Sequence, residues 1–227
     1  MKVVIVGGVA GGATAATRLR RLDEHAQITV FERSGYISYA NCGLPYYIGG
    51  AIEDKEELTL QTPESIGKRF RIDMKVHHEV TDINAEKKTV TVCNLDTGKI
   101  YEESYDKLIL SPGAKPVMPN LPGIENEKIF TLRTVEDTLK IRAFVEDKKP
   151  KTAVIVGGGF IGLEVAENLC DLGVKVTVVQ RPKQLMNTLD YDMATLVHNK
   201  LRSKGISLKL GGDVIGFEEK EQLQVLL

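Results

Sequence analysis

The sequence predicts an α/β fold built from two consecutive βαβ units, and three observations predict it. Short, wholly apolar runs at residues 3–6 and 153–156 are typical of parallel strands that are covered on both faces. A glycine-rich turn directly follows each run, at residues 7–12 and 157–162. A helix-forming segment and a second apolar run then follow each turn, so the order strand, helix, strand occurs twice.

The first unit continues from its turn with a helix expected at residues 13–22 and a strand expected at residues 28–31. Glu32 follows this strand, about 20 residues after Gly12, where a dinucleotide-binding fold places the carboxylate that holds a ribose hydroxyl. The turn departs from the GxGxxG pattern because Val9 occupies the position of the middle glycine. Taken alone, this turn is equally compatible with dinucleotide binding and with a simple tight connection.

The middle of the chain is predicted to complete the first domain and to lead into the second. Two strand-like segments within residues 88–101 flank a turn at residues 96–98 and predict a hairpin. A strand-like run at residues 101–110 leads into residues 111–116, which are rich in glycine and proline, and a helix is expected at residues 134–145. These features indicate a first domain at residues 1–116, a linker with a helix at residues 117–150, and a second domain at residues 151–227.

The second unit matches the dinucleotide pattern in full. Gly157, Gly159 and Gly162 supply the tight turn, the close approach to a pyrophosphate and the packing of the helix against the strand. A helix at residues 163–172 and a strand at residues 174–179 complete the unit. The fold class is therefore α/β, with two Rossmann-like nucleotide-binding domains.

Gln180 and Arg181 occupy the place where the second unit would carry its ribose-binding acid. An acid at this place would repel a 2′-phosphate, whereas an amide and a guanidinium would not. We therefore expect the second site to accept NADPH at least as well as NADH.

Residues 38–46, between the two turns, contain the candidate reactive group, Cys42. Pro45 suits the first position of a helix, and Gly49 with Gly50 would end that helix about one turn later. Cys42 is therefore expected at or just before a helix N-terminus, where free N–H groups and the helix dipole favour a thiolate. The other interpretation is a small apolar residue packed under a turn.

The distance of Cys42 along the chain from Glu32 favours the reactive interpretation. The ten residues between these positions span at most about 33 Å when extended, enough to run from a ribose alongside a bound dinucleotide to its reactive ring. A bound FAD would let a hydride from nicotinamide pass through the flavin to a disulfide made by Cys42. The two turns and the cysteine together predict thiol redox chemistry.

Composition excludes several other classes of partner. The 30 basic and 31 acidic side chains are mixed along the chain, so neither nucleic acid nor a membrane surface is expected as a partner. We expect a cytoplasmic protein, because a strand follows Met1 directly and because three widely spaced cysteines fit a reducing compartment. No metal site or disulfide is predicted, and Cys93 and Cys170 are expected to be structural. The histidines are expected at the surface or in loops; they are His25, His77, His78 and His198.

Four segments carry a resemblance to a known family: residues 7–12, 39–46, 105–113 and 131–133. With these segments the chain resembles the single-cysteine, FAD-dependent pyridine nucleotide-disulfide oxidoreductases, and among them the coenzyme A disulfide reductases and NADH-dependent persulfide reductases. The resemblance covers essentially the whole chain. It implies FAD at the first turn and NADPH or NADH at the second, so that residues 1–116 are the N-terminal part of an FAD-binding domain and residues 151–227 an incomplete NAD(P)-binding domain. It also implies a Cys42 that cycles between a thiolate and a mixed disulfide with a small thiol such as coenzyme A.

The resemblance also implies roles for particular residues. Cofactor-binding roles fall on Gly7, Val9, Ala10, Gly11, Gly12, Glu32, Arg33, Val80, Ser111, Pro112, Gly113, Arg133, Gly157, Gly159, Phe160, Ile161, Gly162, Glu164, Gln180 and Arg181. Substrate-binding roles fall on Thr14, Arg18, Arg21, Ser38 and Asn41. Arg18 and Arg21 are three residues apart on one helix face, where both could reach an anionic substrate, and a solvated basic face is the other interpretation.

Relatives that reduce oxygen or peroxide carry a histidine where this chain has Ala10, and their cysteine segment lacks the pair Ala40-Asn41. Both differences favour a thiol substrate, while NADH oxidase or peroxidase activity stays open. In the family, a second FAD-contacting segment and a C-terminal dimerisation domain follow, and full-length relatives are homodimers. The resemblance implies that both segments are absent here.

Residues 206–210 and 216–227 are therefore expected to begin an unfinished sheet, with an unpaired strand edge at residues 223–227. Two functions stay open: a reductase, and a truncated fragment that binds nucleotide and catalyses little. From the missing segments we expect weak retention of FAD and little NAD(P)H-dependent reduction of coenzyme A disulfide by this chain.

Overall fold

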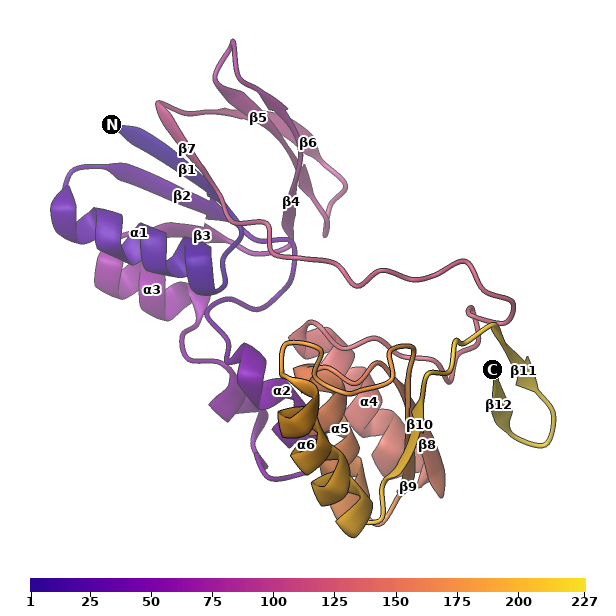
Figure 1. The fold of residues 1–227 in the computed structure, drawn as a ribbon. Helices are drawn as coiled ribbons and strands as arrows, with labels where there is room; N and C mark the ends of the chain where they lie inside the picture. Colours follow the sequence, from indigo (N-terminus) through magenta and orange to yellow (C-terminus); the bar gives the residue numbers. More distant parts are fainter. The chain divides into compact units, whose positions relative to one another are not determined.

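The computed structural model describes residues 1–227 and consists of two compact units (Figure 1). Unit 1 comprises residues 1–40 and 56–114, and unit 2 comprises residues 41–55 and 115–227. Residues 41–55, which the sequence placed in the first domain, thus group with the second half of the chain. Packing explains this grouping, because Ile48 is only 2% exposed and belongs to the apolar core of unit 2.

A four-stranded parallel sheet forms the centre of unit 1, in the order β3-β2-β1-β7. Its strands are β1 (Lys2–Val6), β2 (Gln27–Phe31), β3 (Asp73–Lys75) and β7 (Lys107–Leu110). Helix α1 (Ala10–Leu22) packs on β1 and β2, and helix α3 (Pro63–Phe70) packs on β3. Figure 1 shows both helices on the same face of the sheet.

A three-stranded antiparallel sheet, β4-β5-β6, completes unit 1. Its strands are β4 (His78–Asn84), β5 (Thr89–Asn94) and β6 (Ile100–Ser104), and the predicted hairpin of β5 and β6 is confirmed. The run expected as one strand at residues 101–110 is instead two strands, which belong to different sheets. The chain turns between them because the N–H of Asp106 donates to the carbonyl of Lys2 at 2.8 Å, and the Asp106 carboxylate accepts the N–H of Lys2 at 2.6 Å.

Strand β1 is an apolar run because other elements of unit 1 cover both of its faces. Val3 and Ile5 are buried with residues of α1 and α3. Val4, which points to the opposite face, is buried with Val90 and Val92 of β5. The three middle residues of β1 are all buried, so these positions are apolar on both faces of the strand.

A three-stranded parallel sheet forms the centre of unit 2, in the order β10-β9-β8. Its strands are β8 (Thr152–Val156), β9 (Lys175–Gln180) and β10 (Ser207–Leu210). Helix α5 (Phe160–Asp171) packs on β8 and β9, and helix α6 (Tyr191–Ser203) packs on β10. Two further helices of this unit are α2 (Leu44–Ile48), which follows a 3₁₀ turn at Asn41–Gly43, and α4 (Val135–Lys148).

Helices α1 and α5 begin at Ala10 and Phe160, three residues earlier than the sequence predicted, so each helix starts inside its glycine-rich turn. Helix α4 begins with a capping box at Thr134, where its start was expected. Helices α3 and α6 were not predicted. Helix α3 does carry a local start signal, because Thr62 caps it and Pro63 is its first residue.

Strands β11 (Gly216–Glu219) and β12 (Leu223–Leu226) form a separate antiparallel hairpin in unit 2. The expectation of an unpaired edge at residues 223–227 is therefore wrong, because β12 pairs with β11. The hairpin is attached to the chain near Pro122, whose carbonyl accepts the N–H of Phe217 at 2.8 Å. The parallel sheet itself has two edge strands, β10 and β8, and β8 exposes Val154 and Val156.

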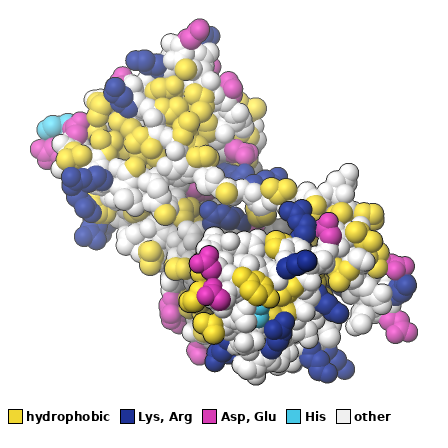
Figure 2. Space-filling view, viewed as in Figure 1, with side chains coloured by type: hydrophobic (Ala, Val, Ile, Leu, Met, Phe, Trp, Pro, Cys, Tyr) yellow, Lys and Arg dark blue, Asp and Glu magenta, His cyan; other side chains and the backbone are white.

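Figure 2 shows Lys and Arg side chains interspersed with Asp and Glu side chains over the visible face, as the nearly equal numbers of acids and bases predict. None of the helices combines the length and the apolar character that crossing a membrane requires. The expectation that all four histidines lie at the surface or in loops is wrong for His198, which is buried in α6, and for His78, which is half-buried at the start of β4.

Candidate active site

Close backbone contacts fix the conformation of the first glycine turn, at residues 7–12. Gly7 has a φ of +96°, and a Cβ atom there would lie 2.0 Å from the carbonyl oxygen of Ser111. A Cβ atom on Gly12 would lie 1.7 Å from the carbonyl oxygen of Gly7. Glycine is therefore required at both positions. Ser111 itself lies against Gly11, 3.1 Å from where a Cβ atom would be, so these predicted cofactor residues do come together.

Helices α1 and α5 begin without a side-chain cap and without an acidic residue in the first turn. Helices α3 and α4 both begin with a complete capping box. The N–H groups at the start of α1 and α5 are thus left without a protein side chain as acceptor. A pyrophosphate group would supply the missing acceptor and would be favoured by the helix dipole.

Glu32, the predicted ribose-binding acid, is held by the turn itself. Its side chain is 9% exposed. Oε2 accepts the N–H of Gly8 at 2.7 Å, and Oε1 accepts the N–H of Ser34 at 2.9 Å. These bonds fix the carboxylate and leave each oxygen with further capacity to accept a ribose hydroxyl.

The other predicted residues of unit 1 lie at the surface around this turn or farther along the same elements. Arg33 is exposed and forms an ion pair with Glu79 at 3.8 Å. Val80 is half-buried on β4. Pro112 and Gly113 are exposed after β7, and exposed positions along α1 carry the three substrate-binding candidates Thr14, Arg18 and Arg21. Val9 is the N-cap residue of α1, and Ala10 is its first residue.

The second glycine turn repeats this geometry in unit 2. Gly157 has a φ of +110°, and a Cβ atom on Gly162 would lie 2.1 Å from the carbonyl oxygen of Gly157. Gly159 has open space within 4 Å of the place of its Cβ atom. Gly157 and Gly162 are therefore needed for the packing of the turn, while Gly159 leaves open space through which a pyrophosphate could approach.

Gln180 takes the place in unit 2 that Glu32 takes in unit 1. Its Oε1 accepts the N–H of Gly158 at 2.9 Å, just as the Glu32 carboxylate accepts the N–H of Gly8. The amide keeps the hydrogen bond that orders the turn without bringing a negative charge to the ribose site. Arg181, the next residue, is exposed.

Each turn is also supported by a residue with an unusual backbone conformation, which the sequence did not reveal. Ser38, with a φ of +45°, donates its N–H to the carbonyl of Gly8 at 3.1 Å. Met186, with a φ of +50°, donates its N–H to the carbonyl of Gly158 at 2.9 Å. Ser38 lies six residues after Glu32, and Met186 lies six residues after Gln180. This equal spacing could have been found in the sequence.

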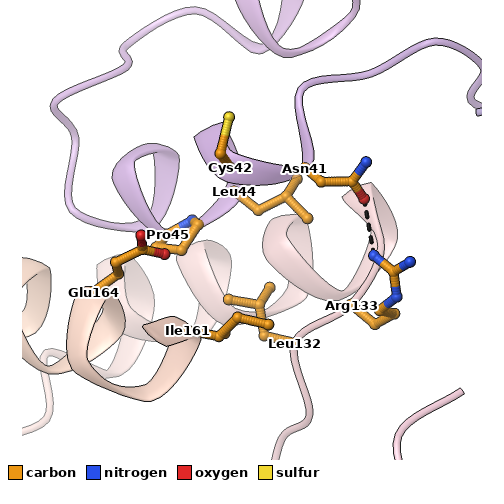
Figure 3. A pocket seen from close by; sticks show the side chains of 8 residues that line it. All are labelled: Asn41, Cys42, Leu44, Pro45, Leu132, Arg133, Ile161 and Glu164. Atoms are coloured by element: carbon orange, nitrogen blue, oxygen red, sulfur yellow. Dashed lines mark hydrogen bonds between the residues drawn. The ribbon is translucent and has the colours of Figure 1, made fainter. Parts of the chain in front are cut away.

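Cys42 lines a pocket that lies wholly within unit 2 (Figure 3). Cys42 is exposed and forms no disulfide. It is the middle residue of the 3₁₀ turn that precedes α2, and Pro45 is the second residue of α2 rather than the first. The predicted location before a helix is thus confirmed, although α2 has only five residues. The pocket is lined by Asn41, Cys42, Leu44, Pro45, Leu132, Arg133, Ile161 and Glu164.

Residues from three segments surround this cysteine. Ile161 and Glu164 belong to α5, the helix that begins at the second glycine turn, and Arg133 lies just before α4. The Arg133 guanidinium donates to Oδ1 of Asn41 at 2.9 Å, as Figure 3 shows. This bond joins a predicted cofactor residue to a predicted substrate residue and fixes the turn that carries Cys42.

Arg142 of α4 holds the far end of α2, and the sequence analysis did not identify it. Its Nη1 donates to the carbonyl oxygens of Tyr47, Ile52 and Glu53 at 3.2–3.4 Å. Its guanidinium carbon lies 4.1 Å from the centre of the Tyr47 ring. No local signal marks this residue, because its partners are about 90 residues earlier in the chain.

The family model for pyridine nucleotide-disulphide oxidoreductases matches residues 1–227. The coenzyme A disulfide reductase of Staphylococcus haemolyticus is 41% identical over 218 residues, which is 96% of this chain and 49% of that protein. The crystal structure of reduced Bacillus anthracis CoADR-RHD is 51% identical, with a TM-score of 0.95 over 96% of this chain and 39% of that one. An NAD-dependent persulfide reductase from A. fulgidus is 36% identical, with a TM-score of 0.94 over 100% of this chain and 42% of that one.

The chain belongs to the pyridine nucleotide-disulphide oxidoreductase family. It spans about half the length of the curated relatives that it matches. The fold class predicted from the sequence, with two parallel nucleotide-binding sheets, is confirmed.

Proposed function

We propose that this chain forms the nucleotide-binding and cysteine-bearing part of an FAD-dependent oxidoreductase that uses NAD(P)H to reduce a small-thiol disulfide or persulfide of coenzyme A type. One observation carries the proposal. Cys42, exposed and without a disulfide partner, shares a pocket with Ile161 and Glu164 of the helix that begins at the second glycine turn. An exposed, unpaired thiol near a dinucleotide-binding turn suits thiol redox chemistry in which a flavin passes electrons from nicotinamide to sulfur.

The residues of unit 1 fit FAD. The uncapped start of α1, the glycines at positions 7 and 12 and the fixed carboxylate of Glu32 suit the pyrophosphate and ribose of a dinucleotide. Ser111 and Gly11 would border the same ligand. Arg133, another FAD residue that the family resemblance implies, lies in unit 2. When bound, the flavin supplies the two-electron step between nicotinamide and sulfur.

The protein's own chemistry centres on Cys42. Its thiolate attacks one sulfur of the substrate disulfide, the disulfide bond breaks, and the second thiol leaves with a proton. Cys42 is then held in a mixed disulfide with the first thiol. Asn41, fixed by Arg133, orients the turn that presents the sulfur. The anionic part of a coenzyme A substrate would be attracted by exposed arginines such as Arg18 and Arg21.

Gln180 and Arg181 extend the proposal to the reductant. The second turn is ordered by a neutral amide, so no carboxylate opposes the 2′-phosphate of NADPH. We therefore propose that NADPH and NADH both serve. For the assembly, we propose the homodimer of the full-length relatives, with no nucleic-acid or membrane partner and a cytoplasmic location.

Two measurements test the function. Incubation with coenzyme A disulfide, followed by mass spectrometry, is expected to show one coenzyme A adduct on the wild-type chain and none on Cys42→Ser. Cys93→Ser and Cys170→Ser are the matched controls and keep the adduct. An adduct that persists in Cys42→Ser contradicts the proposal.

The second measurement distinguishes the reductase from a fragment that only binds nucleotide. The visible absorbance spectrum of the purified chain, before and after addition of FAD, reports flavin binding. Oxidation of NADPH with coenzyme A disulfide as acceptor then reports turnover, with oxygen alone as the acceptor in a parallel assay. NAD(P)H oxidation that depends on oxygen and not on the disulfide would favour an oxidase.

A further inference from the structure

His198 is buried beside the loop that supports the second glycine turn. It is 3% exposed on α6, and its Nε2 accepts the backbone N–H of Leu185 at 3.0 Å. An Nε2 atom that accepts a hydrogen bond carries no proton, so the ring is neutral, with its proton on Nδ1.

Leu185 and Met186 contact Gly158 directly. The Leu185 side chain is fully buried, and its Cδ2 lies 2.2 Å from the place of a Cβ atom on Gly158. Met186 donates its N–H to the carbonyl of Gly158 while its φ is +50°, a region that residues other than glycine rarely adopt. A loop in this conformation needs contacts that hold it, and the hydrogen bond to His198 is one of them.

The first glycine turn has the same support without a histidine. Ile37 takes the place of Leu185, with its Cγ2 2.9 Å from the place of a Cβ atom on Gly8, and Ser38 donates to the carbonyl of Gly8. The buried charged residues of unit 1 are Arg20 and Glu32. Only the second turn is therefore supported through a group that gains a charge near neutral pH.

The surroundings of His198 oppose its protonation. Burial lowers the pKa of His198, and the positive charge of Arg202, one turn further along α6, lowers this pKa again. The Tyr191 ring of the same helix meets the imidazole edge-on at 6.5 Å. The supporting loop contributes Arg181 and Lys183, both exposed cations. Helix α6 also carries Lys200 and Asp192, and Asp190 is its N-cap residue, but Arg202 is the charged group that shifts the pKa of His198, and its positive charge favours the neutral ring.

We propose that His198 is a positioning residue for the nicotinamide nucleotide: its neutral ring holds Leu185 and Met186 beneath Gly158, and its protonation weakens nucleotide binding at the second turn. The proposal rests on the proposed function of that turn. A proton added at Nε2 removes the acceptor and leaves the buried N–H of Leu185 without a partner. Because the pKa of His198 is lowered on folding, this support is fully present above the ordinary histidine value of about 6.5 and is lost as pH falls through the folded value.

The test is isothermal titration of the full chain with NAD⁺ from about pH 8 down to about pH 5, a range that extends well below the ordinary histidine value because the pKa of His198 is lowered, and that contains no titration of the probe. Affinity in the wild type is expected to fall about tenfold across this range, the scale of one lost buried hydrogen bond. His198→Asn is expected to remove the pH dependence, because an amide oxygen can accept the N–H of Leu185 and does not titrate. His25→Asn, at an exposed position of unit 1, is the matched control and keeps the wild-type profile.

Histidine NMR on the unaltered protein gives a second measurement that needs no variant. The midpoint of the His198 titration is expected to coincide with the midpoint of the affinity change. A wild-type affinity that is independent of pH, or two midpoints that differ, overturns the role of His198. Absence of NAD⁺ binding at every pH, with native circular dichroism, overturns the proposed function of the second turn instead.

Discussion

Gly162 and Gly159, the third and the middle glycine of the second turn, have different roles, and single substitutions distinguish these roles. In Gly162→Ala the new Cβ atom would lie 2.1 Å from the carbonyl oxygen of Gly157, so the helix must move away from the strand. We expect a loss of about 2 kcal/mol in the free energy of unfolding, together with loss of NAD⁺ binding. Urea unfolding and NAD⁺ titration measure the two effects.

Gly159→Ala is the matched control for that substitution. Open space surrounds the place of its Cβ atom, so the free energy of unfolding is expected to change by less than about 0.5 kcal/mol. The methyl group nevertheless occupies the side from which a pyrophosphate approaches, and NAD⁺ affinity is expected to fall at least about tenfold. Unchanged affinity in Gly159→Ala would show that the nucleotide does not approach this turn.

Gln180→Glu tests the choice between NADPH and NADH. The new carboxylate can keep the hydrogen bond to the N–H of Gly158, as Glu32 does to Gly8, but it places a negative charge where a 2′-phosphate would bind. We expect the ratio of NADPH affinity to NADH affinity to fall about tenfold or more, measured by quenching of cofactor fluorescence. Gln184→Glu is the control, because it adds the same charge in the same loop, where the Gln184 side chain donates to the carbonyl of Leu189. A strong preference of the unaltered protein for NADH would contradict the role given to Gln180 and Arg181.

At the scale of elements, α2 depends on α4 for its position. Arg142→Met removes the donor to the carbonyl groups of Tyr47 in α2 and of Ile52 and Glu53 in the loop that follows, and the charge that faces the Tyr47 ring. We expect a loss of about 2 kcal/mol in the free energy of unfolding. Alkylation of Cys42 with iodoacetamide should also change in rate, because the turn that carries the thiol is no longer fixed at both ends.

Arg69→Met is the matched control for Arg142→Met. The Arg69 guanidinium lies 5.2 Å from the centre of the Phe70 ring in unit 1, so this variant removes a ring contact of the same kind in the unit that does not contain Cys42. It should leave the alkylation rate unchanged. Equal alkylation rates in both arginine variants would show that Arg142 does not position the cysteine turn.

Elements with local signals could be predicted from the sequence, and contacts between distant residues could not. The strand, turn and helix of each βαβ unit were predicted because one apolar run and one glycine pattern lie next to each other. Helix α3 was missed because its start signal at Thr62 and Pro63 is not followed by an apolar run. The roles of Arg142 and of His198 were missed because their partners are set by the fold and by no neighbouring residue.

At the scale of the whole molecule, the location of residues 41–55 could not be predicted, because segment composition does not reveal which core an apolar helix joins. Unit 2 cannot be obtained as one continuous piece of chain. Residues 115–227 alone would lack Ile48, and a Cβ atom at Gly49 would lie only 2.1 Å from Asn168 of α5, which shows how closely α2 packs on that helix.

We therefore expect the isolated fragment of residues 115–227 to be less stable than the same unit within the full chain, by about 3 kcal/mol or more, because a core side chain and the partners of Arg142 are removed. Urea unfolding followed by circular dichroism measures this difference. A fragment in which residues 41–55 are joined to residue 115 through a flexible linker is the control and should recover most of the loss. Equal stability of the two fragments would show that α2 is not part of the core of unit 2.

The division of unit 2 into two stretches of sequence also has a consequence for biosynthesis. Helix α2 leaves the ribosome about 120 residues before α5 is complete. At 5–20 residues per second this interval is between about 6 and 25 s. Until α4 and then α5 have emerged, Leu44, Tyr47 and Ile48, which are all buried in the finished protein, lack the helices that pack on them. The nascent chain therefore exposes apolar surface that the folded protein covers, and we expect chaperones that bind nascent chains to matter more for this protein during its synthesis than after folding.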